Sequence, residues 1–240
     1  MLSRAHVVGS FLALYPDATD LEVGVNQGET FLAVSAAKKV AVDPNFTFDT
    51  VSVTAPGMEF HPIRSDTYFA SRSAALDRFD VIFLDGLHTF EQTLRDLMNA
   101  VANLAAGGVI VIDDVIPNSF DASLPDLEQV HTLRQISART GVPWPSDGSW
   151  MGDVFKLVFF IDTFMQQYSF ATVQENHGQC IFWYQLRPAN TILQRSMEQI
   201  CRLDYRDTLL NRHTFNILPL DQIVAQVAKA RDLQPGLSKS

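Results

Sequence analysis

Residues 21–30 read Leu21-Glu22-Val23-Gly24-Val25-Asn26-Gln27-Gly28-Glu29-Thr30, a short apolar strand that runs into a glycine-marked turn and the start of a helix. Glycine has no Cβ, so the two glycines allow a tight turn and a close approach of bare backbone to a nucleoside-bearing ligand. A second apolar segment, residues 39–42, ends in Asp43. Asp43 follows Glu22 by about twenty residues. This is the sequence spacing at which a doubly wound sheet places an acid on the ribose hydroxyls of its ligand.

Segments typical of strands and helices alternate from residue 20 to about residue 185. The expected strands cover residues 20–25, 39–42, 59–64, 81–84, 109–112, 170–174 and 180–185. Most are short, continuous apolar runs, as expected for strands that are buried on both faces. The alternation predicts an α/β fold with a doubly wound, mostly parallel, seven-stranded sheet.

An amphipathic helix is expected between the fourth and fifth strands. Apolar residues recur there at helical spacing, namely Phe90, Leu94, Leu97, Val101 and Leu104. Polar residues occupy the other faces, namely Glu91, Arg95, Asp96 and Asn99. Gly107-Gly108 is expected to end this helix before the next strand begins.

Composition and charge bound the class of protein. With 240 residues, 47% of them hydrophobic, the chain can bury one large core. A net charge of −9 with only 18 Lys and Arg disfavours nucleic acid, which needs a basic surface, so a small-molecule substrate is expected. Two cysteines make neither a disulfide framework nor a zinc cluster, which suits a reducing cytosol. The apolar run at residues 154–165 is too short for a bilayer, so we expect a cytoplasmic protein with no membrane partner.

Residues 116–152 form an irregular insertion rich in Pro, Gly and Trp. We expect a helix inside it, at about 124–139, and interpret the insertion as a lid or pocket wall, with a plain surface loop as the alternative. Its candidates for lining a pocket are Phe120, Trp144, Trp150 and Met151. The predicted organisation is a catalytic domain over residues 1–187 and a helical extension over residues 188–240. Helices at 191–203 and 220–232 would pack on the core or on a second subunit of a homo-oligomer.

Carboxylates and a histidine follow two successive strands. Asp85 ends the fourth expected strand, His88 follows three residues later, and Asp113-Asp114 ends the fifth. If both strands end at one edge of the sheet, the three acids converge there and repel one another unless a cation neutralises them. Oxygen ligands of this kind favour Mg²⁺, with Mn²⁺ or Ca²⁺ as alternatives. The structural alternative is a turn at Asp85-Gly86, a helix start at His88 and a loop cap at the acid pair.

Taken together, these motifs resemble those of class I S-adenosylmethionine-dependent methyltransferases, in the small-molecule group that carries Asp-Gly-x-His followed by an aromatic residue. The matching pieces are the Glu22/Gly24/Gly28 loop, Asp43, the run Asp85-Gly86-Leu87-His88-Thr89-Phe90, and Gly107-Gly108 leading to Asp113-Asp114. The resemblance implies a Rossmann-like methyltransferase fold whose last strand is antiparallel.

The resemblance also implies a role for each matching residue. Glu22, Gly24 and Gly28 would line the amino-acid and ribose side of S-adenosylmethionine, with Asn26 and Thr30 as neighbours and Asp43 on the ribose hydroxyls. Ser65 and Asp66 would lie near the adenine. In metal-dependent catechol-type and macrolide-sugar O-methyltransferases, acids after strands four and five hold Mg²⁺, and Asp85, Asp113 and Asp114 fall on those positions. His88 stands where the catechol-type enzymes have a lysine base, a departure that a macrolide-type site with a histidine base would suit.

These roles predict metal-assisted O-methylation of a small-molecule hydroxyl. Methyl transfer from a sulfonium is an in-line displacement, so alignment of acceptor, methyl and sulfur supplies much of the acceleration. A bound Mg²⁺ would lower the pKa of the acceptor oxygen, and a neutral His88 could take its proton near pH 7. A vicinal diol would contact Mg²⁺ at two points, which favours catechol-like or sugar-diol acceptors.

Three alternatives remain at this level. An NAD(P)-dependent oxidoreductase shares the sheet and the acid after the second strand. It would need a third glycine where Asn26 stands, and it has no task for Asp113-Asp114. A non-catalytic methyltransferase-like binding domain is the second alternative. The third keeps the cofactor without a metal, with His88 acting alone.

Overall fold

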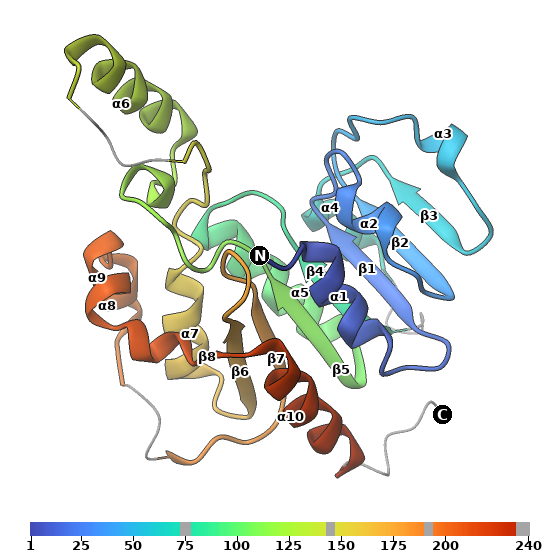
Figure 1. The fold of residues 1–240 in the computed structure, drawn as a ribbon. Coiled ribbons are helices and arrows are strands. Elements are labelled where there is room, and N and C mark those ends of the chain that lie inside the picture. Colours follow the sequence, from blue (N-terminus) through green and yellow to red (C-terminus); the bar gives the residue numbers. More distant parts are fainter. Residues whose placement is uncertain (73–77, 143–146, 190–193, 234–240) are drawn as a thin grey trace.

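The structure is a computed structural model that describes residues 1–72, 78–142, 147–189 and 194–233 (Figure 1). Its centre is one sheet in the order β3-β2-β1-β4-β5-β7-β6-β8. The strands are β1 (Thr19–Val23), β2 (Lys38–Val42), β3 (Met58–His61), β4 (Phe79–Leu84), β5 (Leu104–Ile112), β6 (Tyr168–Val173), β7 (Cys180–Tyr184) and β8 (Ile217–Leu218).

The first five strands pair in parallel, and β7 runs antiparallel to both β5 and β6. The doubly wound fold and its antiparallel strand are therefore confirmed. Among the described residues the sheet has eight strands rather than the predicted seven, because β8 adds to β6 in parallel. Two residues are too short for a recognisable apolar pattern, so the sequence did not reveal β8.

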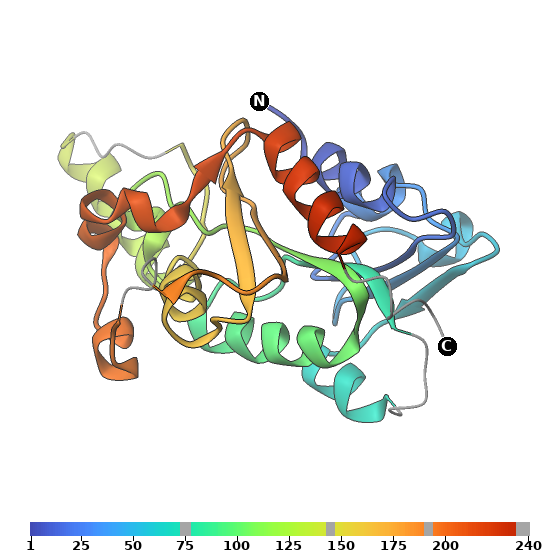
Figure 2. The same ribbon diagram turned by 90° about the horizontal axis from the view of Figure 1, so that it is seen from below.

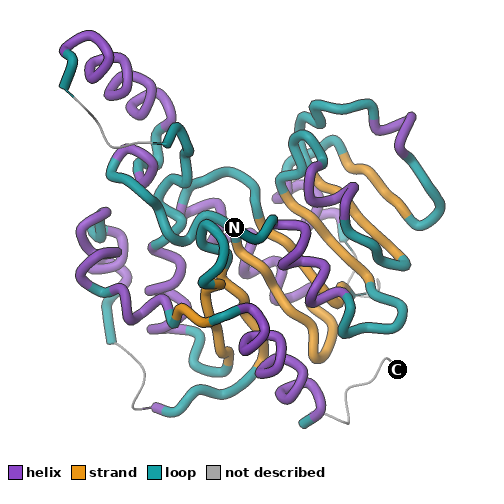
Figure 3. The backbone as a smooth tube through the Cα atoms, in the orientation of Figure 1, coloured by secondary structure: helices purple, strands orange, loops and turns teal. Residues whose placement is uncertain are grey.

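Helices cover both faces of the sheet, as the backbone trace shows (Figure 3). The α-helices of the described residues are α1 (Arg4–Leu12), α2 (Glu29–Ala33), α3 (Thr50–Val53), α4 (Ser65–Ser71), α5 (Phe90–Asn103), α6 (Leu127–Thr140), α7 (Lys156–Phe164), α8 (Met197–Cys201), α9 (Tyr205–Leu210) and α10 (Leu220–Asp232). Figure 2 shows α1 and α10 on one side of the sheet and α5 on the other. No helix of the described segments combines the length and apolar composition needed to cross a bilayer.

Strand β4 illustrates why this fold forms from this sequence. All six of its residues are buried, Asp80 among them, and the continuous apolar run at residues 81–84 predicts this burial for the last four. Val81 and Phe83 pack with α1 and α10, whereas Ile82 and Leu84 join a cluster that includes Leu97 of α5. Successive side chains of a strand point to opposite faces, so one apolar run supplies both cores.

Two local predictions around α5 were wrong. The helix ends at Asn103, and Leu104 already begins β5, so Gly107-Gly108 lies inside the strand rather than at the helix end. Gly107 has φ +72°, and a Cβ on Gly108 would lie 2.9 Å from the carbonyl oxygen of Asp80, which explains the glycines there. Asp96 was expected on a polar, exposed face of the helix, but it is buried in the wall of the pocket described below. A hydrogen bond from Gln92 satisfies its carboxylate there.

The insertion contains the predicted helix, α6, which projects from the body of the molecule (Figure 1). Its base is held by buried Asp121, which pairs with Arg134 at 2.6 Å and accepts from Ser119 at 2.7 Å. Trp144 lies outside the described residues. At the C-terminus, α10 coincides with the helix predicted at 220–232, and α8 lies within the one predicted at 191–203, part of which is outside the described residues.

Buried Asp20 on β1 leads to a prediction about stability. Neither of its carboxylate oxygens accepts a hydrogen bond from any described residue. Its register neighbour on β2, Lys39, donates to the carbonyls of Phe31 and Val34 instead. Burial raises the pKa of Asp20 from 3.8 to about 7, although the charge of Lys39 opposes the rise.

We expect Asp20→Asn to be more stable than the wild type at pH 8 by up to about 4 kcal/mol, and similar to it below pH 4. A raised folded-state pKa gives stability that is fully present below the unfolded pKa and is lost as the pH rises through about 7. Urea unfolding of both proteins from pH 4 to pH 8 measures this difference. A stability difference that does not vary with pH would contradict the prediction.

Candidate active site

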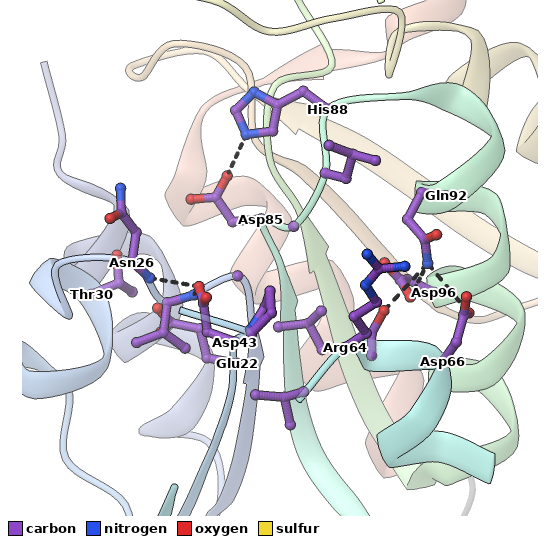
Figure 4. Close-up of a pocket in the computed structure, with 18 of the residues that line it drawn as sticks. Glu22, Asn26, Thr30, Asp43, Arg64, Asp66, Asp85, His88, Gln92 and Asp96 are labelled. Atoms are coloured by element: carbon purple, nitrogen blue, oxygen red, sulfur yellow. Dashed lines mark hydrogen bonds and ion pairs between the residues drawn. The ribbon is translucent and has the colours of Figure 1, made fainter. Parts of the chain in front are cut away.

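A cavity of about 720 Å³ opens at the carboxyl ends of the parallel strands (Figure 4). The loops after β1, β2, β3 and β4 form its wall, together with α5 and the start of α1. Ligands of open α/β sheets bind at this edge, and the volume suits a nucleoside-sized ligand. Its polar lining includes Arg4, Glu22, Asn26, Thr30, Asp43, Arg64, Ser65, Asp66, Asp85, His88, Gln92 and Asp96.

The two glycines of the first loop are required by backbone geometry. Gly24 has φ +85°, and a Cβ there would lie 1.9 Å from the carbonyl oxygen of Asp85, so only glycine lets the ends of β1 and β4 approach. Gly28 has φ +77° and precedes α2. A Cβ on Gly28 would lie 2.9 Å from the ring of Phe48, and Gly28 is not among the residues that line the cavity.

Asp43 holds this loop in place. One of its oxygens accepts hydrogen bonds from the backbone N–H groups of Val25 and Asn26, both at 2.8 Å, and the other accepts from Asn45 at 2.7 Å. Asn26 has φ +46°, a left-handed conformation that these bonds help to maintain. Asp43 also lines the cavity, so it organises the loop in addition to facing any ligand.

Glu22 places a carboxylate without a full set of partners in the cavity wall. It is buried, and its Oε2 accepts no hydrogen bond within the described part of the chain. Burial, with the charges of Asp20 and Asp85 adding to it, raises the pKa of Glu22 well above its usual value. A ligand that brings a positive charge or a hydrogen-bond donor would therefore be stabilised at this position.

Polar side chains from α4 and α5 meet at another part of the cavity. The amide of Gln92 donates to Asp96 at 3.1 Å, to Ser65 at 3.3 Å and to Asp66 at 3.4 Å. Arg95 pairs with Asp66 at 3.0 Å. Ser65 and Asp66 thus lie in the cavity wall among donors and acceptors, at the place where the sequence predicted the adenine.

The structure brings Asp85, Asp113 and Asp114 together with three side chains that can carry positive charge. His88 lies between two of the acids, with Nε2 3.6 Å from Asp85 and Nδ1 3.2 Å from Asp114. Two overlapping sets have the spacing of metal ligands, namely Asp85, His88 and Asp114, and Asp113, Asp114 and His177. Asp85 and His88 line the cavity, whereas Asp113 and Asp114 are not among its lining residues.

The two adjacent acids differ in their partners. Asp113 uses both oxygens, one for His177 Nε2 at 3.0 Å and the other for Arg4. These partners outweigh its burial and lower the pKa of Asp113. Asp114 has φ +60° and is buried, and its Oδ2 lies 3.2 Å from His88 Nδ1 but accepts no hydrogen bond from the described residues. Asp114 is therefore the acid with unused hydrogen-bonding capacity, and burial and the charge of Asp113 raise its pKa.

The insertion contacts His88 directly through Trp150. His88 Nδ1 donates to the carbonyl of Trp150 at 2.7 Å, and the two rings stack with centroids 5.0 Å apart. Burial by itself would lower the pKa of His88. Its interaction with Asp85 and the charges of Asp114 and Asp85 have a larger and opposite effect, so the pKa is raised to about 9. In the ligand-free protein the neighbouring acids therefore stabilise the imidazolium form of His88.

Gly152 permits this contact, and its replacement gives a testable prediction. Gly152 has φ +60°, and a Cβ there would lie 1.5 Å from the carbonyl oxygen of His88. Gly141 also has positive φ, +67°, but open space around its Cβ position. We expect Gly152→Ala to lower the free energy of unfolding by at least about 2 kcal/mol more than Gly141→Ala, because only the first adds a backbone clash to the strained φ. Equal losses in urea unfolding would contradict this.

Sequence reasoning missed Arg4, Gln92, Asp96 and His177. Gln92 and Asp96 are four residues apart on α5, a spacing that puts them on one helix face, and this signal could have been used. Arg4 and His177 come from segments that carry no motif, and only the packing of α1 and of the β6–β7 loop brings them to Asp113.

A family model matches the part of the chain that forms most of this site. Residues 21–115 match the family model described as a methyltransferase domain. Over these residues the chain is similar to methyltransferase domains. The matched segment runs from β1 through Asp113 and Asp114, and it contains most of the cavity wall. The chain has no match among curated proteins.

Solved structures resemble this fold at low sequence identity. One, described as a caffeoyl-CoA O-methyltransferase from Staphylococcus aureus, is 12% identical, with 77% of this chain and 85% of that chain covered and a TM-score of 0.53. Another, the O-methyltransferase TomG from Streptomyces achromogenes in complex with SAM, is 15% identical, with 77% and 82% covered and a TM-score of 0.45.

Proposed function

We propose that this protein transfers the methyl group of S-adenosylmethionine to a hydroxyl oxygen of a small molecule. The observation that carries the proposal is that one cavity is lined both by the Asp43-organised glycine loop and by Asp85 and His88. Cofactor and acceptor would then meet at one edge of the sheet. In-line displacement requires this proximity, because alignment supplies much of the rate.

The cavity suits the cofactor in its polar groups. Glu22 Oε2 lacks a hydrogen bond within the described residues and would be satisfied by a donor of the cofactor's amino-acid part. Asp43 would face the ribose hydroxyls while it holds the loop. Ser65, Asp66 and Gln92 offer hydrogen bonds to an adenine. Two of the solved structures with this fold are described as complexes with SAM or SAH, which supports the same cofactor here.

A divalent cation fits part of the predicted acid set. Asp85, Asp114 and His88 have ligand spacing, and Asp114 Oδ2 is free of hydrogen bonds from the described residues. Asp113 differs from the expectation, because both of its oxygens are already paired with Arg4 and His177. We propose that Asp85 and Asp114 hold Mg²⁺ or Mn²⁺, and that Asp113 becomes available to the ion once Arg4 has moved away. A bound cation would supply positive charge that lowers the pKa of an acceptor hydroxyl.

His88 is the proposed base. Because its Nδ1 faces two acceptors, the Trp150 carbonyl and Asp114, that nitrogen carries a proton, and Nε2 is the atom that can take one from the acceptor. In the ligand-free protein the neighbouring acids keep the imidazole protonated. Positive charge bound at those acids would lower the pKa of His88 and free Nε2. In the metal-free alternative His88 acts alone and the acids are structural.

The preferred acceptor is a vicinal diol, catechol-like or on a sugar, because two neighbouring oxygens could contact a cation at once.

The first experiment is a thermal melt of metal-stripped protein with S-adenosylhomocysteine, with and without Mg²⁺, and with NAD as the control. A ligand at about 100 times its Kd stabilises by roughly 2.7 kcal/mol, a readable shift. No shift with the nucleoside would contradict the proposed function, and a shift with NAD alone would favour an oxidoreductase. Release of S-adenosylhomocysteine with catechols and sugar diols then tests the acceptor class.

A further inference from the structure

The cation that the structure places among the three carboxylates is the guanidinium of Arg4. Its Nε donates to Asp113 and lies 3.7 Å from Asp85, and its Nη2 lies 3.9 Å from Asp114. Arg4 is therefore within ion-pair distance of every acid predicted to bind metal. Sequence motifs give no reason for a cation at this position, since Arg4 is 109 residues from Asp113.

Arg4 is delivered to the cluster by a firmly packed helix. Ser3 caps α1 by accepting from the backbone of His6, and Val7, Val8 and Phe11 are fully buried against the sheet. The side chain itself is 36% exposed and lines the cavity. A long arginine side chain can thus swing toward the cavity while α1 stays in place.

A divalent cation and Arg4 compete for the same oxygens. Like charges about 4 Å apart repel strongly near a protein interior, and the Asp113 oxygen that accepts from Arg4 cannot serve a metal at the same time. The burial and hydrogen-bond deficit of Asp114 Oδ2 show that Arg4 and the two histidines leave one acid of the described cluster incompletely satisfied.

We infer that Arg4 is an internal counter-ion of the acidic cluster, and that a divalent cation binds only by displacing its guanidinium from Asp113. The inference rests on the proposed function for the presence of the metal, and it adds a residue that sets the metal affinity. Arg4 thereby keeps three crowded carboxylates neutralised in the metal-free protein and weakens metal binding.

Mn²⁺ binding to metal-stripped protein, followed by electron paramagnetic resonance of the free ion, tests this without an activity assay. We expect Arg4→Gln to bind Mn²⁺ about 5-fold more tightly than the wild type, the scale of one partly exposed ion pair. Arg4→Lys retains the charge and is expected to bind within about 3-fold of the wild type. Arg139→Gln, an equal charge change on the exposed face of α6, is the matched control and is expected to leave Mn²⁺ affinity unchanged.

Hydrogen exchange gives a second readout in the folded proteins. Mn²⁺ is expected to leave exchange in α1 unchanged in both the wild type and Arg4→Gln, because only the Arg4 side chain moves while the helix stays packed. Equal Mn²⁺ affinities of Arg4→Gln and Arg139→Gln would overturn the inference. So would the absence of Mn²⁺ binding in all four proteins. If S-adenosylhomocysteine still raises the Tm in that case, the cofactor assignment stands while the counter-ion role falls. If it does not, the proposed function fails as well.

Discussion

Asp43→Ala is expected to weaken the binding of S-adenosylhomocysteine roughly 100-fold, or about 2.7 kcal/mol. The substitution removes the acceptor of three backbone N–H groups, at Val25, Asn26 and Asn45, as well as the carboxylate that faces the cavity. Without it the positive φ of Asn26 loses its support, and the glycine loop no longer holds one conformation. Isothermal titration calorimetry below the Tm of the variant measures the effect.

The matched control for this prediction is Asp49→Ala. This substitution removes the same charge from the same loop region, whereas the Asp49 side chain is exposed and caps the short helix α3. We expect its affinity for the nucleoside to stay within about 2-fold of the wild type. If Asp43→Ala binds as tightly as Asp49→Ala, Asp43 neither organises the loop nor contacts the cofactor, and the cofactor site is wrongly placed.

His88→Ala is expected to lower kcat by roughly 10² to 10⁴ with whichever acceptor is turned over, the usual contribution of general-base assistance. Binding of S-adenosylhomocysteine should change by less than about 2-fold, because His88 contacts the acids and the lid rather than the glycine loop. His88→Asn is a second test, since its amide keeps a donor near the Trp150 carbonyl and lacks Nε2. It should be as inactive as His88→Ala if Nε2 takes the proton.

Exposed His131 on α6 supplies the control for the histidine variants. His131→Ala is expected to retain wild-type kcat. A His88→Asn enzyme with more than about a third of wild-type kcat would show that His88 serves to anchor Trp150 and the lid, with another group as the base. Circular dichroism melts of each variant separate a loss of chemistry from a loss of folded protein.

Much of the fold could be predicted because its signals are local. The continuous apolar run of β4 and the periodic apolar face of α5 depend on the geometry of single elements, and both were predicted close to their observed positions. Strand β8 has two residues and no pattern of its own, so it exists only because β6 offers an edge to pair with.

The site was predictable only in part, for the same reason. Asp85, Asp113 and Asp114 converge because carboxyl ends of neighbouring parallel strands meet at one edge, a rule that sequence order alone can apply. The motif cannot give the pKa of His88, because that pKa depends on the distances to Asp85 and Asp114 in the folded protein.

The sequence by itself determined the α/β class, the glycine loop after β1, and the strand ends that carry the acids, since periodicity, turn residues and strand order are properties of short segments. Tertiary structure alone decided which cations meet those acids. Arg4 and His177 reach Asp113 across 109 and 64 residues, brought there by the packing of α1 on the sheet and by the pairing of β6 with β7. Electrostatic energy depends on separation in space, so the charge balance of the site follows from the packed fold and not from any motif.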